Sequence, residues 1–316
     1  MTDRTLSTYA QSVLAQVRKA VVGKDNTLLW VLAAILAGGH ILMEDIPGVG
    51  KTTMALAFSK ALGLDHNRVQ FTPDVLPSDV TGYSVLDQAT GKLTYRPGGV
   101  LCNLLLADEL NRANSRTQSA LLEAMEEGQV TVDGISHKIP SPFIVIATQN
   151  PTGAAGTQLL PDSQIDRFMV RLTLGYPDPR DEIAMVKDRQ GRDPLADIQP
   201  VLTCQLLTAL RAQVADTYAS DELIAYVVSL IGATRGSEHL LRGASPRATL
   251  AVMAMAKAAA RLQGRDYVVP QDIRQVLVTT VAHRLQLTHA ARSQGMTAED
   301  VLQDLLEKIP APKLSK

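Results

Sequence analysis

The most constraining feature of the chain is an apolar segment followed at once by a glycine-rich loop and a helical pattern. The stretch HILMEDIPGVGKTTMALAFSKAL spans residues 40–62. It nearly fits the phosphate-binding pattern G-x-x-x-x-G-K-[ST], but Asp45 stands where the pattern has its first glycine. A loop of this kind binds phosphates through converging backbone N–H groups and the N-terminus of the next helix. One inexact match leaves two interpretations open, a nucleotide site or a plain strand–turn–helix.

Strand and helix patterns alternate along the first half of the chain, and helical patterns dominate after it. Strands are expected over 40–44, 68–72, 101–109, 143–149 and 168–174, with helices over 6–20, 26–36 and 51–63. Such alternation predicts an α/β fold with a mostly parallel sheet covered on both faces. The turn-rich segment GYPDP lies where the alternating strand and helix patterns give way to helical patterns. We therefore predict an α/β domain over residues 1–175 and an all-α domain over residues 176–316.

Local signals add detail to this outline. Residues 83–96 read as a β-hairpin about Gly91, inserted into the α/β domain. Asp133-Gly134 lies between two alternating runs and predicts a second hairpin. Ser115 with Gln118 predicts a capping box at the start of the next helix.

Composition excludes several classes of protein. Apolar residues make up 46% of the 316 residues, so the chain is globular, and the formal net charge of -1 indicates no bulk attraction to nucleic acid or membrane. Nine Lys/Arg against three Asp/Glu lie between Arg235 and Arg292, which leaves open either solvated helix faces or a nucleic-acid surface. Two cysteines indicate a reducing compartment, and no membrane span or signal peptide is apparent. We expect a cytoplasmic protein, with His137 and His283 on its surface.

Polar residues follow two of the apolar strands at the point where each strand ends. Asp108 and Glu109 come directly after LLLA, and Asn150 follows VIATQ. Ligands of open α/β sheets bind outside the carboxyl ends of the strands. There, one acid can hold Mg²⁺, the second can activate a water molecule and Asn150 can fix the same water. Two acids that merely begin a loop are the alternative.

Longer motifs identify a family. The loop, LLLADE and ATQN occur in the order found in AAA+ ATPases, and QFTPDVLPSDVTGY, YRPGGV, DELNRANSRTQSALLEAMEEGQVTVDG and LPDSQIDRF resemble the MoxR family. The resemblance runs from about Val21 into the helical part and implies a P-loop AAA+ three-layer sandwich followed by an all-α lid. It also implies that the loop is a working site, because EDIPGVGKT is a familiar variant in that family.

The resemblance assigns roles to residues by position. ATP is implied to bind to Val22, Gly23, Asp45, Pro47, Gly48, Val49, Gly50, Lys51, Thr52 and Thr53, the first two lining the adenine pocket. Mg²⁺ is implied at Thr52 and Asp108, with Glu109 as catalytic base, Asn150 as first sensor, Arg167 as arginine finger and Arg247 as second sensor. From the residues alone, Arg167 could instead be an ion-pair partner of Asp166 or Asp162, and Arg247 a helix-start residue after Pro246.

Four functions remain to be compared. The resemblance implies an ATP-driven, chaperone-like remodeller that acts as a ring, expected to be a hexamer, with a partner carrying a von Willebrand factor A domain, in assembly or metal insertion. A DNA-handling AAA+ ATPase of helicase or loader type would use the basic segment, but a helix-turn-helix tail, zinc cysteines and a basic-aromatic tract are missing. A transcriptional activator would carry a loop of the Gly-Ala-Phe-Thr-Gly-Ala type, which is absent from the sequence. Glu109 and Asn150 together argue against a nucleotide sensor that does not hydrolyse.

Overall fold

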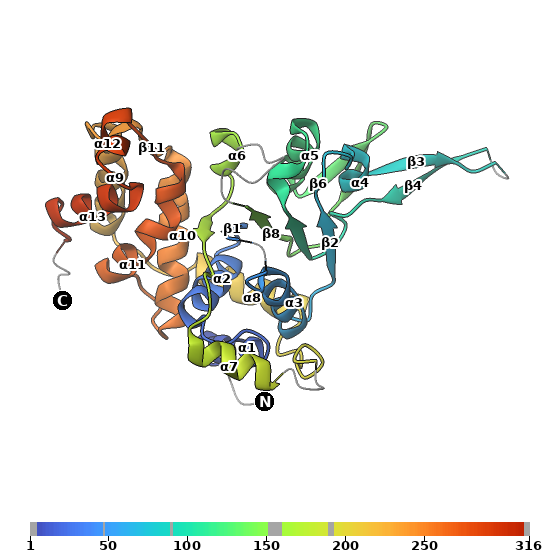
Figure 1. Ribbon diagram of the computed structural model, residues 1–316, viewed down its shortest axis with the longest axis horizontal. Coiled ribbons are helices and arrows are strands. Elements are labelled where there is room, and N and C mark those ends of the chain that lie inside the picture. The colour runs from blue at the N-terminus through green and yellow to red at the C-terminus, as the bar shows by residue number, and fades with distance from the viewer. Residues whose placement is uncertain (1–4, 47, 89–90, 151–159, 189–192, 313–316) are drawn as a thin grey trace.

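A five-stranded parallel sheet forms the centre of the molecule. The computed structural model describes residues 5–46, 48–88, 91–150, 160–188 and 193–312 (Figure 1). The strands lie in the order β2 (His66–Gln70), β5 (Leu104–Asp108), β8 (Ile144–Gln149), β1 (Ile41–Glu44) and β9 (Val170–Leu172). All four pairings are parallel. The predicted central parallel sheet is therefore confirmed, and the carboxyl ends of all five strands meet at one edge.

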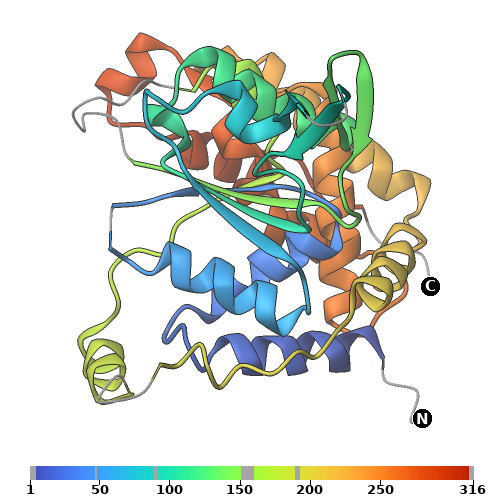
Figure 2. The same ribbon diagram turned by 90° about the vertical axis from the view of Figure 1, so that its right-hand side faces the viewer.

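The sheet separates two apolar cores, because successive side chains of a strand point to opposite faces. In β5, Leu104 and Leu106 pack into one core, while Leu105 and Ala107 pack into the other. The first core lies against α1 (Leu6–Val17), α2 (Asp25–Leu36) and α3 (Lys51–Ala61). The second lies against α4 (Pro77–Thr81) and α5 (Ser115–Glu127), so that the sheet is enclosed between two helical layers (Figure 2).

Two antiparallel hairpins extend the second layer. One consists of β3 (Gly82–Leu86) and β4 (Leu93–Pro97), and it projects away from the sheet (Figure 1). The other consists of β6 (Gln129–Val132) and β7 (Ile135–Lys138), with Asp133 and Gly134 in the left-handed region as the sequence predicted. Tyr95 stacks on His137 with ring centroids 3.6 Å apart, which ties the base of the first hairpin to the second.

The helical part follows β9. It comprises α7 (Pro179–Asp188), α8 (Cys204–Ala215), α9 (Asp221–Arg235), α10 (Pro246–Leu262), α11 (Pro270–Val281), α12 (His289–Ser293) and α13 (Ala298–Lys308), together with a short antiparallel pair, β10 (Leu240–Arg242) and β11 (Gln286–Leu287). Two further short helices precede it, η1 (Leu110–Arg112) and α6 (Asp162–Ile165), and η2 (Ala282–Arg284) follows α11. The first apolar core continues into α8–α11, so lid and sheet share packing. The boundary at residue 175 stays a prediction.

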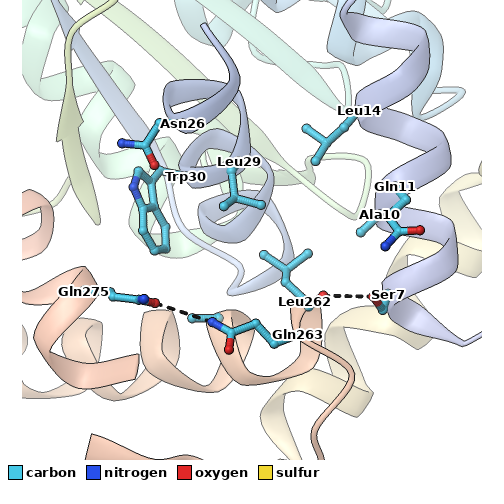
Figure 3. Close-up of a pocket in the computed structure, with 11 residues that line it drawn as sticks. Ser7, Ala10, Gln11, Leu14, Asn26, Leu29, Trp30, Leu262, Gln263 and Gln275 are labelled. Atoms are coloured by element: carbon cyan, nitrogen blue, oxygen red, sulfur yellow. Dashed lines mark hydrogen bonds between the residues drawn. The ribbon is translucent and has the colours of Figure 1, made fainter. Parts of the chain in front are cut away.

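The junction between the N-terminal helices and the lid also contains an open groove. Its volume is about 510 Å³, and α1 and α2 form one wall while α10 and α11 form the other (Figure 3). Ser7 Oγ donates a hydrogen bond to Leu262 O across it at 2.9 Å. Trp30 stands on the α2 side, opposite Gln263 and Gln275.

Two local expectations were wrong. Asn114, not Ser115, caps α5, because its Oδ1 accepts a hydrogen bond from Thr117 N at 3.0 Å. His283 is buried rather than on the surface, and its Nε2 donates to Phe168 O at 3.1 Å. Burial lowers the pKa of His283 well below its usual value, so the ring is neutral. Within the described ranges, no helix combines the length and apolar character needed to cross a membrane.

Candidate nucleotide-binding site

The glycine-rich loop lies between β1 and α3, at the carboxyl edge of the sheet. Gly48 and Gly50 have φ values of 87° and 98°, in the left-handed region that favours glycine. A Cβ atom on either would meet nothing within 4 Å, so backbone conformation and not space explains these glycines. Gly50 is the N-cap of α3 and supplies no side-chain cap, which leaves the first N–H groups of the helix free for an anion.

Lys51 folds back over this loop. Its Nζ donates to Asp45 O at 2.6 Å and to Ile46 O at 3.1 Å. Burial lowers the pKa of Lys51, and the carboxylates of Asp45, Asp108 and Glu109 act in the opposite direction. The ammonium group is therefore held by neutral carbonyl oxygens that an incoming phosphate can replace.

Asp45 points away from the loop interior, as an acid at this position requires. Its carboxylate is buried and accepts hydrogen bonds from the backbone N–H groups of Leu174 and Gly175, the latter at 3.1 Å. The acid thus fastens the phosphate loop to the chain leaving β9. Asp45 has a structural role that the pattern's glycine could not fill.

Restoring the pattern's glycine is therefore expected to harm the protein. Asp45→Gly should lower the free energy of unfolding by about 1–3 kcal/mol, because the buried N–H of Leu174 and the half-buried N–H of Gly175 lose their acceptor. Asp45→Asn keeps one acceptor oxygen and should lose less. Urea unfolding measures both variants, and a fluorescent ATP analogue measures binding. Undiminished stability with tighter nucleotide binding in Asp45→Gly would contradict this account.

The two acids at the carboxyl end of β5, Asp108 and Glu109, lie next to the polar end of β8. Thr148 Oγ1 donates to Asp108 Oδ1 at 2.7 Å and accepts from Glu109 N at 2.8 Å. Glu109 has φ 56°, a left-handed conformation that turns its side chain out of the strand direction. Asn150 Nδ2 donates to Glu109 Oε1 at 3.2 Å. Strand neighbours in the sheet therefore bring the three predicted residues together.

Arginines occupy the outer oxygens of both acids. Arg68 Nη2 donates to Asp108 Oδ2 at 2.7 Å, and Arg112 Nη1 donates to Glu109 Oε2 at 2.8 Å. The hydrogen bond from Arg112 lowers the pKa of Glu109, so its carboxylate is ionised at neutral pH. Arg68, Arg112 and Thr148 were not among the residues predicted from the sequence. Arg112 lies three residues after Glu109, and that spacing could have predicted their contact.

Two adjoining cavities surround the loop. One of about 350 Å³ is polar and is lined by Gly48, Gly50, Lys51, Thr52, Thr53, Arg68, Gln70, Asp108, Glu109 and Asn150. The other, of about 270 Å³, is more apolar and is lined by residues that include Val21, Val22, Val49, Tyr176, Pro177 and Met185. Gly48, Gly50 and Thr53 border both, so the two form one site with a phosphate end and a base end. Gly23 lies against Asp181 of α7 instead, and Pro47 is outside the described residues.

The donor atoms at the phosphate end fit magnesium. The Thr52 hydroxyl and the Asp108 carboxylate line the same cavity, and hard oxygen ligands are what Mg²⁺ takes. Among the described residues, no group of three or more His, Cys, Asp or Glu could hold a metal by itself. That agrees with an ion held by one or two protein oxygens together with phosphates and water.

Arg167 and Arg247 lie outside both cavities. Each pairs with Glu126 at the end of α5, Arg167 at 3.2 Å and Arg247 at 2.5 Å. Arg167 thus pairs with neither Asp166 nor Asp162, the two partners considered from sequence. Neither arginine lines the nucleotide cavities of its own chain.

The sheet, the phosphate loop at its carboxyl edge and the helical lid define a P-loop ATPase of the AAA+ class. Residues 40–170 match the family model of ATPases associated with various cellular activities (AAA), and residues 232–305 match the AAA lid domain. The chain is 42% identical to the uncharacterized protein YeaC of Bacillus subtilis, over 94% of this chain and 92% of that protein. It is 37% identical to the chaperone MoxR1 of Mycobacterium tuberculosis, over 96% and 83%. The crystal structure of a proposed ATPase from Cytophaga hutchinsonii superposes with a TM-score of 0.88 at 34% identity, covering 97% of this chain and 96% of that one. The chain belongs to the MoxR family of AAA+ ATPases.

Proposed function

We propose that the protein hydrolyses ATP with Mg²⁺ and uses the energy, as a ring of subunits, to remodel or assemble partner proteins. The observation that supports this most directly is the single polar cavity that joins the phosphate loop to Thr52, Asp108, Glu109 and Asn150. Purified protein should release phosphate from ATP with Mg²⁺ and not with EDTA. A preparation that binds ATP but releases no phosphate with Mg²⁺ would overturn the hydrolytic part.

The residues divide the reaction between them. Lys51 moves from the loop carbonyls to the outer phosphates, and Thr52 and Asp108 would hold Mg²⁺. The ion offsets the charge of the phosphates when bound. Asp108 must first exchange its bond to Arg68, whose side chain lines the same cavity.

Water activation falls to Glu109. Its carboxylate is ionised and fixed on one oxygen by Asn150, so it can accept a proton from a water aligned with the outer phosphate. Arg112 holds the other oxygen, and the base becomes fully available only when that contact opens. Val22 and Tyr176 at the apolar end would take the adenine.

The charge that develops on the transferred phosphoryl group needs another cation, which we assign to Arg167 of a neighbouring subunit. This assignment agrees with its position outside its own cavities. The resemblance to the family makes a hexamer the expected ring. A partner with a von Willebrand factor A domain, a role in metal insertion and a cytoplasmic location belong to the same proposal. The free thiols of Cys102 and Cys204 agree with a reducing compartment.

The DNA-handling alternative receives little support from the basic segment. Eight of its nine cations are hydrogen-bonded or ion-paired within the protein: Arg235, Arg242, Arg247, Lys257, Arg261, Arg265, Arg274 and Arg284. A nucleic acid would need cations that are free to neutralise its phosphates and so release the counterions condensed on it. A DNA-binding assay at physiological salt separates the two functions, and tight binding would favour the alternative.

The β3–β4 hairpin is the proposed contact for a partner or client. Leu86 and Leu93 are paired across the strands and are 58% and 65% exposed. Deleting residues 85–95 should spare nucleotide binding and damage partner-dependent activity, but it also removes Tyr95, which anchors the hairpin to His137. A sharper variant is Leu86→Ser with Leu93→Ser, which removes apolar surface and leaves the anchor.

We expect this double variant to keep basal ATPase and its melting temperature, and to lose most partner-stimulated activity. Lys92→Ser, also at the exposed hairpin, is the matched control. ATPase and pull-down assays with an identified partner measure the effect. If the variant unfolds, the hairpin stabilises the domain. If partner-stimulated activity is unchanged, Leu86 and Leu93 do not form the partner contact.

A further inference from the structure

Glu126 joins two arginines that are far apart in the sequence. It lies in the last turn of α5, and its two carboxylate oxygens face different partners. Oε2 lies 3.2 Å from Arg167 Nη2, and Oε1 lies 2.5 Å from Arg247 Nη2. One carboxylate therefore brings together the two cations to which the family resemblance gives catalytic roles.

Stability does not explain this arrangement. The side chains of Arg167, Arg247 and Glu126 are 31%, 45% and 41% exposed. Ion pairs this exposed contribute little to folding, since water and salt screen them. Two guanidinium groups held side by side repel each other, however, and the carboxylate between them offsets that repulsion. The consequence of the contact is geometric, because it keeps two like charges together at the surface.

The residues on either side of Arg167, Asp166 and Phe168, are attached to the lid. Arg284 is buried and donates to Asp166 Oδ1 at 2.7 Å and to Phe168 O at 2.7 Å. Ser245 Oγ donates to Asp166 Oδ2 at 3.0 Å. These bonds hold the residues on both sides of Arg167 against η2 and the start of α10.

A second contact extends this attachment along α6. Arg242, in β10 of the lid, pairs through Nη2 with Asp162 Oδ2 of α6 at 2.5 Å. In Figure 1, α6 accordingly lies between the lid helices and α5. Arg167 and Arg247 are therefore both carried by the lid side, and Glu126 meets them from the α/β side.

We propose that Glu126 is a positioning residue that gathers Arg167 and Arg247 into one dicationic group, which a subunit presents as a unit to the phosphates bound by its neighbour. This inference rests on the proposed shared ATPase site. The phosphates of ATP attract the pair more strongly than one exposed carboxylate does, because they carry several negative charges and each guanidinium group can hold two of their oxygens. Glu126 keeps the group assembled until the phosphate arrives.

The test compares Glu126→Gln with Glu127→Gln, which removes a neighbouring exposed carboxylate for which the described residues offer no ion-pair partner. Glu126→Gln should lower kcat about ten-fold with KM for ATP unchanged, a size typical of coupling within one ion-pair network. Glu127→Gln should match the wild type. Glu126→Asp, which keeps the charge on a shorter stem, should recover part of the loss.

Two further readouts separate positioning from simple structural damage. Trapping of ADP with magnesium and aluminium fluoride imitates the transferred phosphoryl group, and it should slow in Glu126→Gln while plain ADP binding and the ring's mass stay unchanged. The effects of Arg167→Ala and Arg247→Ala should be strongly non-additive in the wild type and more nearly additive in Glu126→Gln. Normal kcat and trapping in Glu126→Gln, with an active wild type, would overturn this inference alone. An inactive wild-type ring would overturn the proposed function together with it.

Discussion

Replacing Arg167 by alanine is expected to lower ATP turnover roughly 10³-fold while leaving ATP binding nearly normal, the scale known for arginine fingers. The reason is the position of the side chain. It lines neither cavity of its own chain, so it contributes nothing to ground-state binding there. A planar guanidinium can hold two oxygens of the transferred phosphoryl group together, and alanine leaves that charge uncompensated.

Mixing experiments test whether the site is shared between subunits. Lys51→Ala should lose tight ATP binding, because the cavity loses its ammonium group. Rings that mix Arg167→Ala with Lys51→Ala contain some interfaces with an intact lysine on one side and an intact arginine on the other. Such mixtures should regain part of the activity that each variant lacks. Normal turnover of Arg167→Ala, or turnover that persists in a proven monomer, would rule out a shared site.

Replacing Glu109 by glutamine should slow hydrolysis at least ~100-fold, the usual effect of losing a positioned acid–base group. Asn150 and Arg112 donate to different oxygens of Glu109, and glutamine keeps one of these two acceptors in a side chain of the same shape. What is lost is the ability to take a proton. The variant should therefore bind ATP as the wild type does.

Single-turnover measurements check this without interference from product release. Glu123→Gln, on an exposed position of α5, serves as a matched control and should be fully active. If Glu109→Gln hydrolyses at the wild-type rate, the base is another group. In that case the contact between Arg112 and Glu109 would be an ordinary surface ion pair.

The sequence predicted those parts of the site that follow from strand ends. A polar residue at the end of a buried parallel strand must lie at the carboxyl edge of the sheet. Asp108, Glu109 and Asn150 could therefore be placed together. An acid at position 45 is compatible with bound phosphate only if its side chain points away from the loop, and Asp45 has this orientation. Its partners, Leu174 and Gly175, could not be named, since they follow β9, and the pairing of β9 with β1 depends on the strand order.

Other contacts depend on strand order and on the lid, which the sequence does not state. Arg68 reaches Asp108 because β2 is the neighbour of β5, and any other strand order would have left it elsewhere. Glu126 lies on an exposed helix turn among other acids, so nothing local distinguishes it from Glu127. The capping error at Ser115 had a smaller cause, because Asn114 is an equally good N-cap one residue earlier.

The groove between α2 and the lid has an optical consequence. The chain contains one tryptophan, and Trp30 stands in that groove opposite Gln263 and Gln275. Indole emission depends on the polarity around the ring, and this ring borders both the sheet-side helices and the lid. The wild-type protein therefore carries an intrinsic fluorophore where the N-terminal helices and the lid face each other. A change in the spacing of these helices would change that emission, with no label added.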